Sequence, residues 1–408
     1  MKEEGAAMYK IEKEIVKWIE SNTTKIAFIA VILFGSIIRF SLRKYVSGDA
    51  DTFLLPWYDE IRRNGSLRGL GIQVGNYNML YQFFIAIFTY IPVPALYAYK
   101  IFSCIFDIAL AIIGVLITRE VLEKKDEWSE FVIFSVIYLS PIVFLNSACW
   151  AQCDSIYVFF LMCSIYLLLK EKYGMALFLF GIAVAFKLQA LFLLPFLVMF
   201  YLLSKKFSIL RFLNILIALI VTAIPNFLAG RKITEIFTIY DGQINDSMLL
   251  SRNYPSFWNL LYNETIDIGQ KEMRNVAIII TICVLGIFCV WIMIKNIKRI
   301  KSNYIWIAFL LAYMSVLFLP TMHERYGYLY EILAACILII DKSTCIYIVP
   351  LYIVTFITYG HYLFNVQYNL IIISLVNVCI FIIYLIHFVR IIRKQNDDLE
   401  LRRKNYAK

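Results

Sequence analysis

The sequence has little charge for its length. Of its 408 residues only 17% are charged, while 61% are hydrophobic. A soluble domain needs far more charged side chains on its surface, so this composition excludes one. Repeated apolar runs of about 18 to 22 residues match the ~30 Å hydrocarbon core of a bilayer, and the short alternating segments of a membrane barrel are missing. The sequence therefore predicts an all-α polytopic membrane protein.

Side chains that bind metals are also scarce. There are three histidines, and the nine cysteines are scattered, mostly inside apolar runs where cysteine behaves as a small hydrophobe. The nearest pair, Cys149 and Cys153 in "CWAQC", has no second pair and no histidine at a metal-binding spacing. We expect no metal site and no cofactor.

The pattern of a cleavable signal peptide is not expected at the start of this sequence either. The first residues, "KEEGAAMYKIEKEIVKWIE", are charged and helix-prone and lack a short apolar core with a cleavage site. We predict a cytoplasmic amphipathic segment over 1–24, a transmembrane domain over 25–393 and a charged cytoplasmic tail over 394–408. The net charge of +10 gathers at the ends of the apolar runs, which is typical of topology-setting loops rather than of nucleic-acid binding.

The apolar runs give the number of crossings. One run, 174–203, is about 45 Å long as a single helix, which is too long for one comfortable span. It contains "AFKLQALFLLP", with Lys187 and Gln189 near its middle, so we interpret it as two short helices that meet at a polar turn. This gives a bundle of about twelve transmembrane helices. The runs are 25–42, 95–118, 131–149, 155–169, 174–203, 208–228, 276–294, 304–320, 327–340, 343–360 and 368–389.

The distribution of basic loops supports this hairpin. With a cytoplasmic N-terminus and a hairpin at 174–203, every short basic loop lies on the cytoplasmic side, as the positive-inside rule requires. A single span there would move "KKFSILR" and "DK" to the other side. We therefore predict a multi-pass protein of the cell membrane with both termini in the cytoplasm.

The same topology sends five polar stretches to the opposite, extracytoplasmic face. Within the first of them, a long external loop, "LYQFFIAIFTYIP" (80–92) is too short to cross and is predicted to lie in the membrane interface. The stretches are 47–78, 146–155, 187–189, 229–275 and 321–328.

Several side chains in these stretches have both a functional and an ordinary interpretation. Asp49 and Asp51 in "SGDAD" are either headgroup-level charges or catalytic acids, and they share a side only if the chain is extended. Arg39 is either a snorkelling anchor or a phosphate ligand. Asp154 in "WAQCDSIY" is either a helix N-cap or a site residue. Lys187, an ammonium at membrane depth, requires a salt bridge, a bound anion or a water-filled cavity.

Together these residues favour group transfer from a lipid phosphate to a hydroxyl. Carboxylates supply a base, Arg39, Lys187 and Arg325 supply charge for a phosphate, and Trp57, Trp150 and Trp258 offer faces for a sugar ring.

The strings "SGDADTFLLPWYDEI", "WAQCDSIY", "KLQALFLLP" and "HERY" resemble, in their order and spacing, the GT-C superfamily of polyprenyl-phosphate-sugar glycosyltransferases. Within this superfamily the chain resembles bacterial relatives of the second mannosyltransferase of GPI-anchor synthesis, and more distantly it is similar to dolichyl-phosphate-glucose glucosyltransferases. The likeness covers about residues 25–390. At Ala151 the family often has glycine, a difference without an obvious chemical consequence.

The resemblance implies an inverting transfer from a lipid-phosphate-linked hexose to a glycan or glycolipid acceptor, usually without a metal. It assigns Asp49 as general base, with Asp51 orienting groups nearby. Arg325, with Lys187 and Arg39, would hold the polyprenyl phosphate that leaves. The residues that would line the sugar and acceptor pocket are Trp150, Gln152, Asp154, Gln189, Asn253, Trp258, His323 and Glu324.

Two other functions are compatible with the residues alone. A lipid or solute transporter also places charged, discontinuous segments in the membrane, although internal repeats are not evident here. A non-catalytic partner in polysaccharide export is the other. The sugar, the acceptor, the linkage and the oligomeric state do not follow from the sequence.

Overall fold

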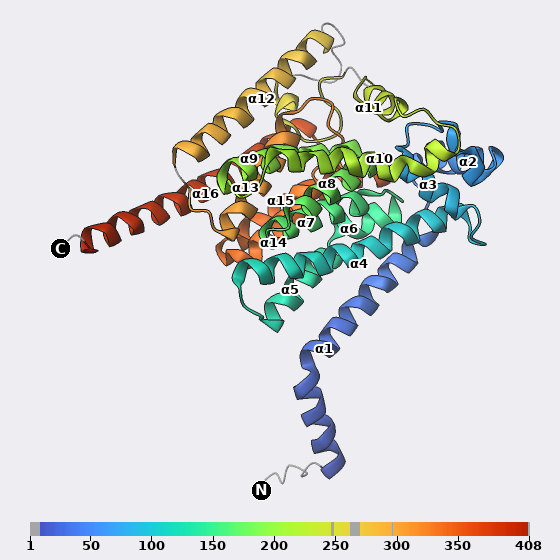
Figure 1. The fold of residues 1–408 in the computed structure, drawn as a ribbon. Helices are drawn as coiled ribbons and strands as arrows, with labels where there is room; N and C mark the ends of the chain where they lie inside the picture. Colours follow the sequence, from blue (N-terminus) through green and yellow to red (C-terminus); the bar gives the residue numbers. More distant parts are fainter. Residues whose placement is uncertain (1–8, 246–248, 262–269, 296, 407–408) are drawn as a thin grey trace.

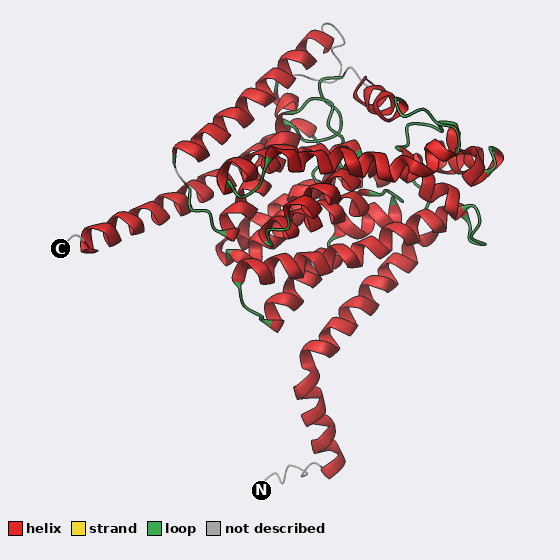
Figure 2. Cartoon of the chain, in the orientation of Figure 1, coloured by secondary structure: helices red, strands yellow, loops and turns green. Residues whose placement is uncertain are grey.

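A computed structural model describes residues 9–245, 249–261, 270–295 and 297–406. In this part of the chain every regular element is helical and there are no strands, which confirms the all-α prediction (Figures 1 and 2). The α-helices are α1 (Lys10–Ser41), α2 (Leu55–Arg63), α3 (Met79–Phe88), α4 (Ala95–Leu122), α5 (Glu127–Tyr138), α6 (Pro141–Phe144), α7 (Asp154–Leu169), α8 (Tyr173–Phe186), α9 (Leu194–Ser204), α10 (Leu213–Leu228), α11 (Glu235–Asn245), α12 (Gln270–Ile294), α13 (Lys301–Phe318), α14 (Tyr328–Ile340), α15 (Cys345–Phe364) and α16 (Leu370–Tyr406).

Seven helical segments of the described chain are long and apolar enough to cross a membrane. An eighth results if α5 and the helical segment Pro141–Cys149, which begins with α6 and is bent by 42° from α5, form one span. The bend falls at Ser140–Pro141, where proline removes a helical hydrogen bond. Five further apolar helices are shorter than a full span, so the prediction of about twelve crossings stays a prediction.

The central helices of the bundle are buried in protein, and the outer helices have exposed apolar surfaces. In α13, 83% of the residues of the apolar window are buried, whereas the share is only 11% in α1 and 22% in both α10 and α12. A helix that is apolar all round is stable only in a core or in lipid. The outer helices therefore expose their apolar side chains to the bilayer, and α13 and α14 form the core.

The two terminal helices pass through the predicted domain boundaries without a break. α1 continues across residue 24, and its N-terminal half stands free of the bundle (Figure 1). α16 likewise continues across residue 393. The three-part division of the chain remains a prediction.

The run at 174–203 forms the predicted hairpin. α8 ends at Phe186, Lys187 adopts extended backbone angles, and a 3₁₀ turn leads into α9. At the far ends of the two helices Lys206 forms an ion pair with Glu171. The chain therefore goes out along α8 and returns along α9.

The short basic loops meet at one end of the bundle. Lys170 and Lys301 both form ion pairs with Glu120, at 2.5 and 2.9 Å, and Lys301 also reaches Glu123 at 2.8 Å. These contacts join the loops that follow α4, α7 and α12. The structure confirms that these loops share an end, as their charge pattern predicts.

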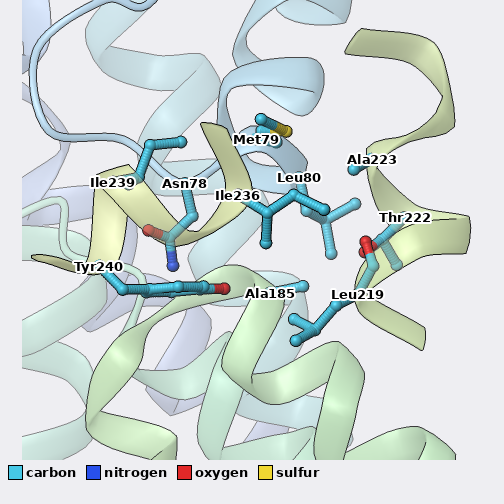
Figure 3. Close-up of a pocket in the computed structure, with 10 residues that line it drawn as sticks. All are labelled: Asn78, Met79, Leu80, Ala185, Leu219, Thr222, Ala223, Ile236, Ile239 and Tyr240. Atoms are coloured by element: carbon cyan, nitrogen blue, oxygen red, sulfur yellow. The ribbon is translucent and has the colours of Figure 1, made fainter. Parts of the chain in front are cut away.

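The helix α3, expected in the membrane interface, is largely buried in protein. Seven of its ten residues are buried, because it packs on α8 and α10. Figure 3 shows the space beside it: Met79 and Leu80 face Thr222 and Ala223 of α10, while Ile236, Ile239 and Tyr240 of α11 close one side. The volume of this space is about 10 Å³, room for about one water molecule. Side chains from four helices, α3, α8, α10 and α11, line it.

Candidate active site

The candidate site begins at the first turn of the helical segment that leads into α2. The hydroxyl of Ser47 accepts a hydrogen bond from the Ala50 amide at 3.2 Å, which makes Ser47 the N-cap. The same hydroxyl donates to the Trp150 carbonyl at 2.9 Å. Ser47 thus fixes both the start of the helix and its position beside Trp150, and it places Asp49 in the first turn.

The Asp49 carboxylate accepts hydrogen bonds from three side chains of other segments. Its Oδ2 accepts from Trp150 Nε1 at 2.9 Å and from Gln152 Nε2 at 2.8 Å. Its Oδ1 accepts from the Tyr362 hydroxyl of α15. The Arg325 guanidinium lies 3.6 Å from Oδ2. Asp49 is therefore held in one orientation by groups from three separate parts of the chain.

Asp51 does not join this arrangement. The local backbone is a π-helical turn, Ala50–Leu54, so Asp49 and Asp51 point apart, and Asp51 is exposed. The structure thus separates the two acids that the sequence left together.

A second π-helical turn, Leu145–Cys149, precedes Trp150. Such turns are frequent at functional sites, because they redirect side chains out of the regular helical pattern. Ala151 follows with φ +63°, in the left-handed region that favours glycine. This backbone conformation gives a physical reason for the glycine that the resemblance leads us to expect at this position, which the sequence alone did not provide.

Asp154 is buried and forms an ion pair with Lys187. Its other oxygen accepts a hydrogen bond from Asn146 Nδ2 at 2.8 Å. Cys153 is the N-cap of α7, and Asp154 is its first residue, so the interpretation of Asp154 as an N-cap is wrong. The structure gives Lys187 a salt bridge, one of the three partners expected for an ammonium at this depth.

The Arg325 guanidinium lies between three carboxylates. Its guanidinium lies 3.6 Å from Asp49, 3.9 Å from Asp154 and 3.3 Å from Glu324. Burial opposes the charge, but the carboxylates of Glu324 and Asp49 outweigh it and raise the pKa of Arg325. Burial raises the pKa of Glu324, with Arg325 acting against it. Arg325 is thus a permanent positive charge surrounded by acids.

His323 lies on the outer side of this cluster. Arg252 donates to His323 Nε2 at 2.6 Å, which requires a free lone pair on that nitrogen. Burial, together with the charges of Arg325 and Arg252, lowers the pKa of His323 to about 2. His323 is therefore a neutral hydrogen-bond acceptor at physiological pH.

Two more predicted residues border the same loop. The Asn253 side chain acts with Arg325 to lower the pKa of Glu324 against the effect of burial, and the Asn253 carbonyl accepts from Tyr368 at 3.3 Å. Burial raises the pKa of Tyr326, and Gln189, from the turn between α8 and α9, acts against it. All five polar stretches of the sequence therefore supply side chains to one end of the bundle.

Three predicted residues have other positions or roles. Arg39 is buried and bound to Asp107 at 2.8 Å and to the Tyr138 carbonyl at 2.9 Å, so its guanidinium holds helices α1, α4 and α5 together and does not face Asp49. Trp258 is buried and donates to the Phe318 carbonyl, so it offers no face to a sugar. Trp150 is fully buried and stacks on Tyr362 at 4.4 Å, so its role is to hold Asp49.

The sequence did not single out three residues of the cluster. Asn146 lies inside the polar stretch 146–155, and Arg252 lies inside 229–275, so both were in view without an assigned role. Tyr362 comes at the end of an apolar run, in "YGHYLFN", with no motif around it. Only the fold brings it to Asp49.

The bundle and this site define a polytopic membrane protein in which a held carboxylate lies beside fixed positive charge. The chain belongs to glycosyltransferase family 87, whose family model matches residues 77–320, more than half of the chain. The match supports a membrane glycosyltransferase of the GT-C type. No curated protein matches the chain. The matched part contains Trp150, Gln152, Asp154 and Lys187, while Asp49 and Tyr362 lie outside it.

Proposed function

We propose that this membrane glycosyltransferase moves a hexose from a polyprenyl-phosphate-linked donor to a hydroxyl of a lipid-linked or cell-envelope glycan, with inversion. The observation that carries the proposal is the Asp49 carboxylate, held by Trp150, Gln152 and Tyr362 and placed 3.6 Å from Arg325. A carboxylate that can take the proton of a sugar hydroxyl therefore lies next to a guanidinium that can bind a phosphate.

In the proposed step Asp49 takes the proton of the acceptor hydroxyl as that oxygen attacks the anomeric carbon. The bond between the anomeric carbon and the phosphate oxygen breaks, and its electron pair leaves with the polyprenyl phosphate. Attack opposite the leaving group inverts the anomeric centre. Phosphate is a good leaving group, so positive charge at the phosphate suffices and no proton donor is needed.

Arg325 is the proposed ligand of the donor phosphate, with Lys187 and Arg252 as supporting charges. A guanidinium binds a phosphate through two parallel hydrogen bonds, and its charge is independent of pH. Arg325 already lies near three carboxylates. The phosphate therefore competes with Asp154 and Glu324 for the N–H groups of Arg325. Before the sugar donor binds, these carboxylates neutralise the charge of Arg325.

The proposed face of action is extracytoplasmic, because the basic loops gather at the opposite end of the bundle. The proposed pocket also includes His323, Glu324, Gln189 and Asn253. The proposed partners are the lipid donor, the glycan or glycolipid acceptor and the surrounding membrane lipids.

The test uses the full-length protein in lipid nanodiscs with polyprenyl-phosphate-mannose and polyprenyl-phosphate-glucose. The acceptor source is a glycolipid extract from cells that lack the protein, and the released polyprenyl phosphate is measured. We expect Asp49→Asn to lower the rate by about 10²- to 10⁴-fold, the usual contribution of a general base.

Asp59→Asn, an exposed acid on α2, is the matched control and should keep the wild-type rate. Equal gel-filtration profiles for both variants show that folding is intact. Full activity of Asp49→Asn would rule out Asp49 as the base. A wild-type protein that releases no polyprenyl phosphate from either donor would favour the transporter alternative.

A further inference from the structure

The two oxygens of the Asp49 carboxylate have different surroundings. Oδ2 accepts from two donors, Trp150 and Gln152, and also faces Arg325. A carboxylate oxygen has two lone pairs, so Oδ2 is fully occupied. Oδ1 accepts only from Tyr362 among the described residues. One lone pair of Oδ1 therefore remains for a further donor.

Tyr362 is itself held in place from two sides. Its ring stacks on Trp150, with 4.4 Å between centroids and 19° between planes. The end of its helix is bound to the segment before Asp49, because Tyr45 donates to the Leu363 carbonyl and its ring packs against Phe364 at 5.8 Å. The Tyr362 hydroxyl is thus fixed relative to Asp49 through both its ring and its backbone.

We propose that Tyr362 is a positioning residue for the base, and that the acceptor hydroxyl approaches Asp49 at Oδ1, on the side of Tyr362 and the C-terminal end of α15. This inference rests on the proposed function of Asp49. Tyr362 occupies one lone pair of Oδ1 and directs the other, which receives the acceptor proton.

This arrangement places the two substrates on different sides of one carboxylate. Arg325, the proposed phosphate ligand, lies next to Oδ2, while Oδ1 points toward Tyr362. Inversion requires that the attacking oxygen and the leaving phosphate lie on opposite sides of the anomeric carbon. The proposed acceptor therefore lies on the Tyr362 side of the carboxylate, and the leaving phosphate lies on the Arg325 side.

The proposal also indicates which segment of the chain contacts the acceptor and selects it. The segment after α15 carries the exposed residues Asn365 and Gln367, next to the half-buried Tyr362. These polar side chains lie outside residues 77–320, the part that matches the family model. We therefore expect acceptor contacts from a region that the family match does not cover.

The test is Tyr362→Phe in the nanodisc assay described above, at varied donor and acceptor concentrations. Phenylalanine keeps the stack on Trp150 and removes only the hydroxyl. A displaced base oxygen costs up to about 100-fold in rate, so we expect kcat to fall by between 10- and 100-fold. The donor half-saturation should stay within about twofold, because the phosphate side of the site is unchanged.

Tyr352→Phe is the matched control on the same helix. It also removes one hydroxyl, which donates to the Glu331 carbonyl at 3.1 Å, and it should keep kcat and both half-saturation values. An unchanged kcat in Tyr362→Phe, with Asp49→Asn inactive, would overturn this inference alone. An increase in the donor half-saturation with kcat unchanged would also overturn it, since Tyr362 would then serve the donor side. Full activity of Asp49→Asn would overturn the proposed function itself.

Discussion

At the scale of single residues, His323 shows how burial beside fixed charges sets protonation. Its pKa is lowered to about 2, below the ordinary 6.5, by burial and by Arg325 and Arg252. As the pH falls below 6.5, the unfolded chain binds a proton at this residue and the folded protein does not. The stability that His323 contributes is therefore fully present above pH 6.5 and is lost progressively below it.

This linkage predicts a pH-dependent difference between the wild type and His323→Gln. Between pH 6.5 and 5 the wild type should lose about 2 kcal/mol that the variant keeps, since each pH unit corresponds to about 1.4 kcal/mol. The measurement is the melting temperature of the detergent-purified protein at both pH values. His361→Gln, a change of a histidine outside this cluster, is the control. Equal acid sensitivity of wild type and His323→Gln would contradict a neutral, buried His323.

Residue types and motifs predicted the members of the site better than their partners. Lys187 was found because a charge at membrane depth is rare and costly, whereas Asp49, Asp154 and Arg325 were found through the strings in which they lie and the family resemblance that these strings carry. The partner of Arg39 was not foreseeable, because Asp107 lies 68 positions away inside an apolar run. Trp258 likewise looked available until the fold buried it against α13. Pairing over such distances depends on helix packing, which no local pattern encodes.

At the scale of an element, the turn between Cys149 and Asp154 determines whether the site forms. Ala151 is fully buried with φ +63°, between the two residues that donate to Asp49. Alanine tolerates this left-handed conformation at some cost, and a β-branched residue does not.

We therefore predict that Ala151→Val destabilises the protein by roughly 1–3 kcal/mol, the usual cost of such backbone strain. Activity should fall with it, because Trp150 and Gln152 on either side are displaced from Asp49. Ala151→Gly is the matched control, since glycine adopts this conformation freely and should keep the activity. Melting temperature and release of polyprenyl phosphate are the two measurements. An Ala151→Val variant as stable and active as the Ala151→Gly variant would show that the turn bears no strain.

The hairpin at 174–203 could be predicted because length and charge agreed. A run of about 30 apolar residues exceeds one span, and the basic loops on its two sides had to lie together. α3 could not be placed in this way. Nine of its ten residues are apolar and suit an interface as well as a core, and its packing on α8 and α10 shows that most of them are buried in protein.

At the scale of the whole molecule, charged side chains form one cluster at each end of the bundle. One end is held by ion pairs among basic loops, such as Lys301 with Glu120, and the other by the cluster around Arg325. The sequence predicts which loops lie at the same end, because successive membrane-crossing helices place their loops at alternate ends. Their absolute orientation in the membrane depends on the positive-inside rule, which the fold alone does not test.

The helix α15 allows a direct test of orientation, because it joins the two ends. Cys345 at its start is exposed and lies near Asp341, which binds His387, while Tyr362 at its other end reaches Asp49. Twenty residues of α-helix span about 30 Å, the thickness of the hydrocarbon core. The basic loops predict that the Cys345 end faces the cytoplasm.

We expect a membrane-impermeant maleimide to label Cys345 only after the cells are permeabilised. In the Cys345→Ser background, Gln367→Cys, at an exposed position beyond α15, should be labelled in intact cells. The other exposed cysteines, Cys283 and Cys379, are replaced by serine in both cases so that the signal comes from one position. Labelling of Cys345 but not of Gln367→Cys in intact cells would place the Asp49 site in the cytoplasm and overturn the proposed face. Labelling of both in intact cells would mean that α15 does not cross the membrane, which its length and apolar surface contradict.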